Sequence, residues 1–148
     1  MPKRIIPVSS GKGGVGKTTV ATNFALSLSR YAPTLLVDLD TGTSSVRNTI
    51  GVPVERDLYH FFKKGLRLDE CITALPASWD PDGLYAQFGF VAAPLHLIEE
   101  VTNFGPERKA QLSEATRKSS QSRPSESGRT PLGSRKATIP SGVITTVE

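Results

Sequence analysis

The 148-residue sequence predicts an α/β fold, an incomplete doubly wound parallel sheet followed by a disordered C-terminal tail. Three observations lead to this fold class. The first 40 residues alternate strand, glycine-rich loop, helix and strand, which is a βαβ unit with a right-handed crossover. The second strand is apolar on both faces, as in a parallel sheet that helices cover on both sides. Residues 113–148 contain no aromatic residue and cannot bury enough apolar surface to form a core.

The βαβ unit begins with a strand expected at residues 3–9, although Pro7 removes one donor from its ladder. A glycine-rich loop follows at residues 10–16, and a helix is expected at residues 17–30. Five apolar residues recur at helical spacing and predict the buried face of this helix: Val20, Ala21, Phe24, Ala25 and Leu28. The second strand is expected at residues 34–39.

Weaker patterns follow the second strand. A short helix is expected at residues 55–64, with Leu58 and two phenylalanines facing inward and Gly65 as its end. Another short helix is expected at residues 68–75. The other predicted features are a turn at 79–83, a third strand at 88–93 and the start of a helix at 95–104.

Composition divides the chain into a foldable part, residues 1–112, and a tail, residues 113–148. The tail is rich in Ser, Thr, Pro and Gly, and it carries most of the net charge of +4. Its basic residues are scattered rather than clustered, so we expect a disordered tail. The alternative is a basic arm that binds nucleic acid or a membrane surface, although the chain has no direct nucleic-acid motif.

Cysteine usage and hydropathy favour a cytoplasmic protein. Cys71 is the single cysteine, which excludes a disulfide within the chain. No apolar run approaches the roughly 18 residues of a membrane-spanning helix. We also expect no secretory leader, because no charged segment followed by an apolar segment opens the sequence.

Residues 11–18 match the pattern G-x-x-x-x-G-K-[ST] at each required position. The glycines let successive backbone N–H groups point at phosphate oxygens, and the next helix adds unpaired N–H groups and its positive dipole end. Lys17 supplies a charge for the β- and γ-phosphates, Thr18 offers a hydroxyl to Mg²⁺, and Thr19 reaches the α-phosphate. The fold is therefore expected to be of the P-loop NTPase type. The expected cofactor-binding residues are Gly11, Lys12, Gly13, Gly14, Val15, Gly16, Lys17, Thr18 and Thr19.

Two carboxylates, Asp38 and Asp40, stand at the carboxyl end of the second strand, where open α/β sheets bind ligands. From these residues alone, the two aspartates are equally consistent with a solvated acidic turn and with a ligand-binding pair. Lys12 is also ambiguous by itself, because an ordinary phosphate loop does not need a second lysine and a solvated loop lysine would fit as well.

The stretch Lys-Gly-Gly-Val-Gly-Lys-Thr-Thr (12–19), with Asp-Leu-Asp at 38–40, resembles the deviant Walker A motif and switch I of the MinD/ParA family of ATPases. The resemblance implies ATP and Mg²⁺ as cofactors, and an ATP-dependent homodimer that positions or partitions a cellular structure. It implies that Lys12 reaches the partner's nucleotide, that Asp40 orients the attacking water and that Asp38 lies near the metal. The implied catalytic residues are Lys12, Lys17 and Asp40, and the implied metal-site residues are Thr18, Asp38 and Asp40.

The resemblance covers roughly residues 1–105 and leaves some family features without a counterpart. Family members continue with a strand that ends in Asp-x-x-x-Gly, the Walker B and switch II segment, and no such segment follows here. A complete doubly wound sheet also needs about 180 residues, at about 30 for each strand–helix unit. We therefore expect that the change of composition near residue 113 marks a truncated or frame-shifted reading of a longer gene.

Two further functions stay open. The chain fits a non-catalytic nucleotide-binding fragment that keeps the phosphate loop and lacks switch II, so its own catalysis is uncertain. A P-loop ligase similar to dethiobiotin synthetase is disfavoured, because the motif with two lysines fits it less well. The sequence also leaves the cargo unspecified, and with it any membrane-associated or DNA-associated partner.

The remaining residues are interpreted as structural. His60 and His96 have no partner at ligand spacing, so neither is expected to bind a metal. Cys71 is expected to be a small buried residue rather than a nucleophile. Five aromatic residues are expected in the core rather than in a stacking platform for bases: Phe61, Phe62, Trp79, Tyr85 and Phe88.

Overall fold

The computed structural model describes residues 4–40, 45–95, 106–118 and 143–147. Its strands are β1 (Arg4–Val8), β2 (Thr34–Asp38), β3 (Thr73–Ala74), β4 (Phe88–Val91) and β5 (Val143–Val147). They form one sheet in the order β1-β5-β2-β4-β3, parallel everywhere except between β3 and β4. The predicted α/β class is confirmed, with a short antiparallel strand at one edge instead of a purely parallel sheet.

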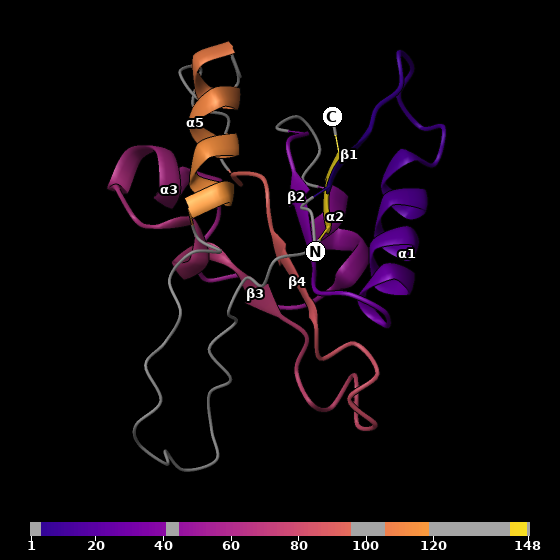
Figure 1. Cartoon of the computed structure of the whole chain (residues 1–148). Coiled ribbons are helices and arrows are strands. Elements are labelled where there is room, and N and C mark those ends of the chain that lie inside the picture. Colours follow the sequence, from indigo (N-terminus) through magenta and orange to yellow (C-terminus); the bar gives the residue numbers. More distant parts are fainter. Residues whose placement is uncertain (1–3, 41–44, 96–105, 119–142, 148) are drawn as a thin grey trace, which may run out of the picture.

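Helices cover both faces of this sheet (Figure 1). On one face lie α1 (Lys17–Ser29) and α2 (Ser45–Ile50). On the other lie α3 (Leu58–Lys64), the 3₁₀ turn η1 (Leu68–Cys71) and α5 (Pro106–Lys118). This arrangement confirms the doubly wound prediction. Within the described parts of the chain, every helix is too short or too polar to cross a bilayer.

Strand β2 lies at the centre of the molecule and is buried along its whole length between β5 and β4. Leu36 packs into the core beneath α1 and α2, whereas Leu35 and Val37 pack into the core beneath α3, η1 and α5. Successive side chains of a strand point to opposite faces, so a strand that is apolar on both faces requires two helical layers. This is the burial that the sequence predicted for residues 34–39.

Helix α1 fully buries only two of the five residues that were predicted for its inner face, Ala21 and Ala25. Val20 and Phe24 are 62% and 40% exposed, whereas Ala21 and Ala25 are fully buried and Ser29 is buried beside them. These three small residues are spaced four apart and form one stripe along the helix. The stripe lets α1 lie close to β2 and β5, and bulkier side chains there would hold the helix away from the sheet. Side-chain size, rather than hydropathy, therefore selected the buried face.

The short elements differ from the predictions at their boundaries. Helix α3 begins at Leu58 rather than at residue 55, because the side chain of Asp57 caps its first turn. Gly65 ends the helix as predicted, in the left-handed conformation. The helix predicted at residues 68–75 is wrong beyond one turn, since η1 ends at Cys71 and β3 then pairs with β4. Pairing with a distant strand has overridden the local pattern.

Most of the aromatic predictions are confirmed. Phe61 and Phe88 are buried, and Phe62 and Tyr85 pack against the two cores. Trp79 is the exception, because its side chain is largely exposed on the turn that connects β3 with β4. That turn was predicted correctly. Its geometry depends on Asp80, whose carboxylate accepts hydrogen bonds from two backbone N–H groups that follow.

Regular structure extends into the segment that was predicted to be a disordered tail. Helix α5 continues to Lys118, so the boundary predicted at residues 112 and 113 falls within a helix, and Leu112 is buried in the core beside α3. Strand β5 places residues 143–147 between two other strands. A strand paired on both sides can form without an aromatic core of its own, because its backbone groups find partners in the ladder. Apart from Leu95, the helix start predicted at residues 95–104 lies outside the described residues.

Gly89 tests how tightly β4 packs against the segment before β3. A Cβ atom at this position would lie 2.7 Å from Cγ2 of Ile72, a branched side chain that cannot easily move aside. We expect Gly89→Ala to lower the free energy of unfolding by about 1–3 kcal/mol, measured by urea denaturation. Gly11→Ala is the control, because nothing lies within 4 Å of its Cβ position. Equal stability of the two variants would contradict this packing.

Candidate phosphate-binding site

The glycine-rich loop between β1 and α1 has the backbone geometry that the motif predicts. Gly14 and Gly16 have positive φ angles of 75° and 87°, a region that L side chains rarely adopt. Gly16 is the N-cap of α1, and no side chain caps the helix there. A helix N-terminus without a side-chain cap leaves backbone N–H groups and the positive dipole end available to an anion. The loop therefore fits a phosphate group.

Lys17 and Asp40 meet at one end of the sheet. Nζ of Lys17, at the start of α1, lies 3.6 Å from Oδ2 of Asp40, which follows β2. Both side chains are partly buried. The structure thus brings together two of the three predicted catalytic residues from separate elements. The ammonium group of Lys17 therefore lies at this edge of the sheet, where a phosphate would be a second anionic partner for it.

Of the other predicted residues near the loop, Lys12 and Thr19 are exposed and Thr18 is half-buried. Lys12 is exposed, and its carbonyl oxygen accepts a hydrogen bond of 2.9 Å from Oγ of Ser10. Thr18 is half-buried within the first turn of α1. Thr19 is exposed, and its carbonyl oxygen accepts a hydrogen bond from the side chain of Asn23. The exposure of Lys12 leaves its side chain accessible to a second molecule.

Asp38 is fully buried at the end of β2, and two backbone groups hold its carboxylate. The backbone N–H of Asp40 donates to Oδ1 at 3.0 Å, and that of Val46 donates to Oδ2 at 3.2 Å. Burial raises the pKa of Asp38 to about 6, because it disfavours the charged form more strongly than the two hydrogen bonds favour it. Asp40 also raises this pKa, and Lys17 lowers it. Asp38 therefore ties the end of β2 to the start of α2.

Helix α2 is a part of the site that the sequence patterns missed. It has only six residues, of which several are β-branched, so local propensity is weak. The carboxylate of Asp38 accepts from its first turn, and Gly51 follows its end with a positive φ angle of 69°. The signal available in the sequence was Asp38 at the end of the strand and Gly51, a possible helix end, thirteen residues later.

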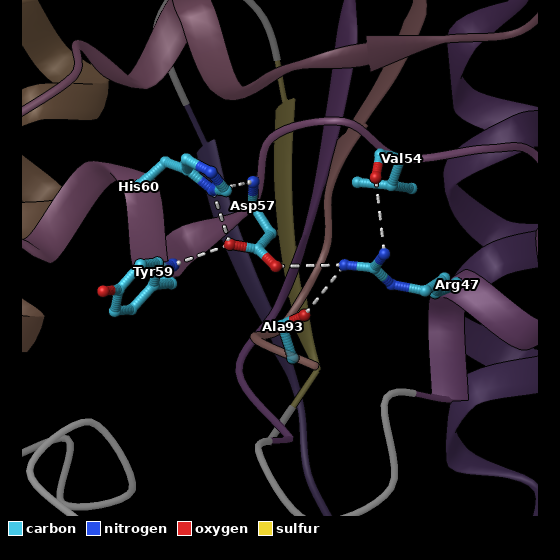
Figure 2. Close-up of polar contacts among 6 residues, drawn as sticks. All are labelled: Arg47, Val54, Asp57, Tyr59, His60 and Ala93. Atoms are coloured by element: carbon cyan, nitrogen blue, oxygen red, sulfur yellow. Dashed lines mark hydrogen bonds and ion pairs between the residues drawn. The ribbon is translucent and has the colours of Figure 1, made fainter. Parts of the chain in front are cut away.

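A polar network connects α2 to α3 and to the end of β4 (Figure 2). Nη2 of Arg47 donates to Oδ2 of Asp57 at 3.1 Å, and the guanidinium also reaches the carbonyl oxygens of Val54 and Ala93 at 3.5 Å. The side chains of Arg47 and Asp57 are only 14% and 10% exposed. A buried pair of this kind is sensitive to loss of either partner, because the remaining charge would stay buried without compensation.

Asp57 also organises the start of α3. Its Oδ1 accepts a hydrogen bond of 3.0 Å from the backbone N–H of Tyr59 and lies 3.0 Å from Nδ1 of His60. When Nδ1 carries a proton it donates to this carboxylate, and when it does not it can accept from the backbone N–H of Asp57, 3.2 Å away. His60 thus has a structural partner at the helix N-terminus. His96, the other histidine, lies outside the described residues.

The residues at this end of the sheet fit a magnesium–triphosphate group. The open N-terminus of α1 and Lys17 suit phosphate oxygens. Thr18, Asp38 and Asp40 carry hydroxyl and carboxylate oxygens, the hard ligands that Mg²⁺ takes, usually with several waters retained. Both oxygens of Asp38 already accept backbone hydrogen bonds, which suits a place outside the direct ligands. In the described segments, no three His, Cys, Asp or Glu side chains cluster as a ready metal site.

Known proteins similar to this chain include proteins named for chromosome partitioning and for determination of the septum site. A family model described as an AAA domain matches residues 3–119. The chromosome-partitioning ATPase Soj of Thermus thermophilus is 37% identical over 109 residues, covering 69% of this chain and 42% of Soj. A putative septum site-determining protein MinD of Tupiella akineta is 40% identical over 73 residues, covering 47% of this chain and 24% of MinD. The chain therefore spans less than half of the length of these relatives.

Solved structures share the fold. A plasmid partition protein from Borrelia burgdorferi has a TM-score of 0.64 at 18% identity, covering all of this chain and 56% of that protein. The septum site-determining protein MinD of Pyrococcus horikoshii, complexed with Mg-ADP, has a TM-score of 0.62 at 21% identity, covering 97% and 48%. At these identities the similarity supports the fold alone.

The buried carboxyl of Asp38 makes stability depend on pH. Its pKa is 3.8 in the unfolded chain and about 6 in the folded protein, so the folded state holds the additional proton between these values. Stability is therefore greatest below about pH 4 as far as this group is concerned, and it falls as the pH rises through 6. Urea denaturation without Mg²⁺ or nucleotide should show a loss of roughly 3 kcal/mol from this group. Asp38→Asn should lack this slope, and parallel pH profiles of the two proteins would contradict the assignment.

The network of Arg47 and Asp57 should matter more for stability than a shorter but exposed ion pair. Asp57→Ala removes the cap of α3 and leaves the guanidinium buried without its partner, so we expect a loss of about 3–5 kcal/mol in urea denaturation. Asp69→Ala is the control, because its 2.7 Å pair with Arg67 is exposed and should contribute about 1 kcal/mol or less. Similar losses in the two variants would show that burial does not set the importance of these pairs.

Proposed function

The chain belongs to the AAA domain family and corresponds to the N-terminal part of the MinD/ParA ATPases, and from this membership we propose that it binds ATP together with Mg²⁺. The observation that carries the proposal is the approach of Lys17 to Asp40 beside the open N-terminus of α1. This arrangement puts a cation, a row of backbone N–H groups and a carboxylate at one edge of the sheet. Each of them has a partner in a magnesium–triphosphate group.

We further propose that ATP is hydrolysed in a nucleotide-dependent homodimer. Lys17 would bind the β- and γ-phosphates, and Thr18 would hold the metal. Asp40 would orient the attacking water, while Asp38 would support the metal from outside its direct ligands. Lys12 would act on the nucleotide of the partner subunit. Its exposure supports a role across an interface.

The cellular role proposed is spatial positioning or partitioning. Relatives at 37% and 40% identity are named for chromosome partitioning and for determination of the septum site. The matched part includes the phosphate loop and the two carboxylates, which are the parts that would bind and sense nucleotide. We also propose that the protein acts in the cytoplasm. The partner or cargo would be recognised by surfaces other than this site.

A second candidate function is nucleotide binding without turnover. The observation that favours it is that residues 83–148 contain no aspartate and therefore no Asp-x-x-x-Gly segment. The two functions share the phosphate loop and differ in whether the γ-phosphate is cleaved. Binding and hydrolysis therefore have to be measured separately.

Substitution of the two loop lysines separates binding from turnover. Lys17→Ala should weaken binding of ATP with Mg²⁺ roughly 10- to 100-fold, because it removes a charge-assisted contact to phosphate. Lys12→Ala should leave binding within about threefold and lower turnover on the order of 10³-fold if the lysine acts in trans. Binding is measured by calorimetry and turnover by phosphate release. Lys64→Ala, an exposed lysine at the end of α3, is the control for loss of charge.

Three outcomes are decisive. Wild-type turnover in Lys12→Ala would exclude the role across the interface. Binding without phosphate release in the wild-type chain would favour the second function. Unchanged binding in Lys17→Ala would contradict the proposed phosphate site itself.

A further inference from the structure

Strand β5 separates the two strands that carry the candidate site. Val143 is in register with the first residues of β1 and β2, and Val147 is in register with their last residues, Val8 and Asp38. All five residues of β5 have parallel partners on both sides. The strand lies outside residues 3–119, the part that the family model matches, so the family match assigns it no role.

The candidate site is assembled across the carboxyl end of β5. The phosphate loop follows β1, and Asp40 follows β2. Among the described strands β1 pairs only with β5, so the first half of the loop has no other anchor in the sheet. The second half of the loop is different, because α1 packs against β2 and α2 directly. The contact between Lys17 and Asp40 bridges the two sides at 3.6 Å.

We propose that β5 is a positioning segment for the nucleotide site, which holds β1 and the phosphate loop in register with β2. The strand contributes its backbone ladder rather than a ligand, and without it β1 would have no partner among the described strands. The proposal rests on the proposed function, since it concerns the same loop. It also implies that removal of β5 from the sheet would weaken nucleotide binding, because the loop after β1 would lose its fixed position.

Thermodynamic linkage gives the proposal a measurable consequence. If nucleotide binds more tightly when β5 is in the sheet, then nucleotide must stabilise β5 in the sheet by the same factor. The sequence of the strand, Val-Ile-Thr-Thr-Val, is rich in β-branched residues and forms strands readily. We therefore expect residues 143–147 to enter the sheet when β1 and β2 are positioned to pair with them, and nucleotide binding would favour that position.

The experiment interrupts the ladder without removing the segment. Ile144→Pro with Thr145→Pro removes two successive backbone donors, which point to opposite neighbours in a central strand. Ile144→Val with Thr145→Val changes the same positions and keeps the donors, so it is the matched control. Binding of a fluorescent ATP analogue with Mg²⁺ is measured by anisotropy. We expect the proline pair to bind about tenfold more weakly or worse, and the valine pair to bind as the wild-type chain does.

Cys71 reports whether the fold survives these substitutions. It is the last residue of η1 and is buried in the core with residues of α3, next to β3, which β2 and β4 separate from β5 in the sheet; burial raises the pKa of its thiol to about 11. The thiol should resist a thiol reagent at pH 8 as long as this core is intact. Weak binding with a protected thiol supports the positioning role. Wild-type binding by the proline pair with a protected thiol would overturn it.

A measurement on the unaltered chain decides the case in which the proline pair unfolds. Amide hydrogen exchange of residues 143–147 is followed with and without the ATP analogue and Mg²⁺. Protection that increases on binding supports the proposal, and fast exchange in both conditions would overturn it. If the wild-type chain does not bind the analogue at all, the proposed function fails. If it binds and the proline pair binds equally well, only the role of β5 fails.

Discussion

The fully buried carboxylate of Asp38 is the interaction on which the candidate site depends. It ends β2, and its two oxygens accept the backbone N–H groups of Asp40 and Val46. A buried carboxylate is costly unless such donors surround it, so the chain has little freedom in how it leaves the strand. The position of Asp40 opposite Lys17 and the start of α2 beside α1 both follow from this constraint.

Close packing of small residues brings the layers near enough for the site to form. The stripe of Ala21, Ala25 and Ser29 lets α1 approach β2, which places the start of the helix beside the end of that strand. On the other side of α2, Arg47 reaches Asp57 and two carbonyl oxygens and ties α2 to α3 and to the end of β4. The glycine-rich loop therefore lies near Asp40. The segment that carries Asp38 and Asp40 is fixed by β2 before it and by α2 after it.

The strands that carry the candidate site residues are separated in the sheet by a strand that carries none of them. The loop and the aspartates come from β1 and β2, which are distant partners joined through β5. The matched relatives place this chain among ATPases whose names refer to partitioning and septum positioning, and the match covers the loop and the aspartates. The two strands that carry the candidate site do not pair with each other, so the relative position of the loop and the aspartates depends on the strand between them.

By itself, the sequence determined the phosphate loop, the helix after it, the buried character of β2 and hence the doubly wound α/β class. Each of these is encoded by glycine positions or apolar spacing within a short stretch, and local physics is sufficient to form it. Only the tertiary structure decided which face of α1 is buried, that residues after Cys71 pair with β4, that α2 exists, and that residues 143–147 enter the sheet. It also decided that Lys17 meets Asp40 and that Lys12 is exposed. These features depend on side-chain size, buried charge and strand partners contributed by residues far apart in the chain, which no local pattern records.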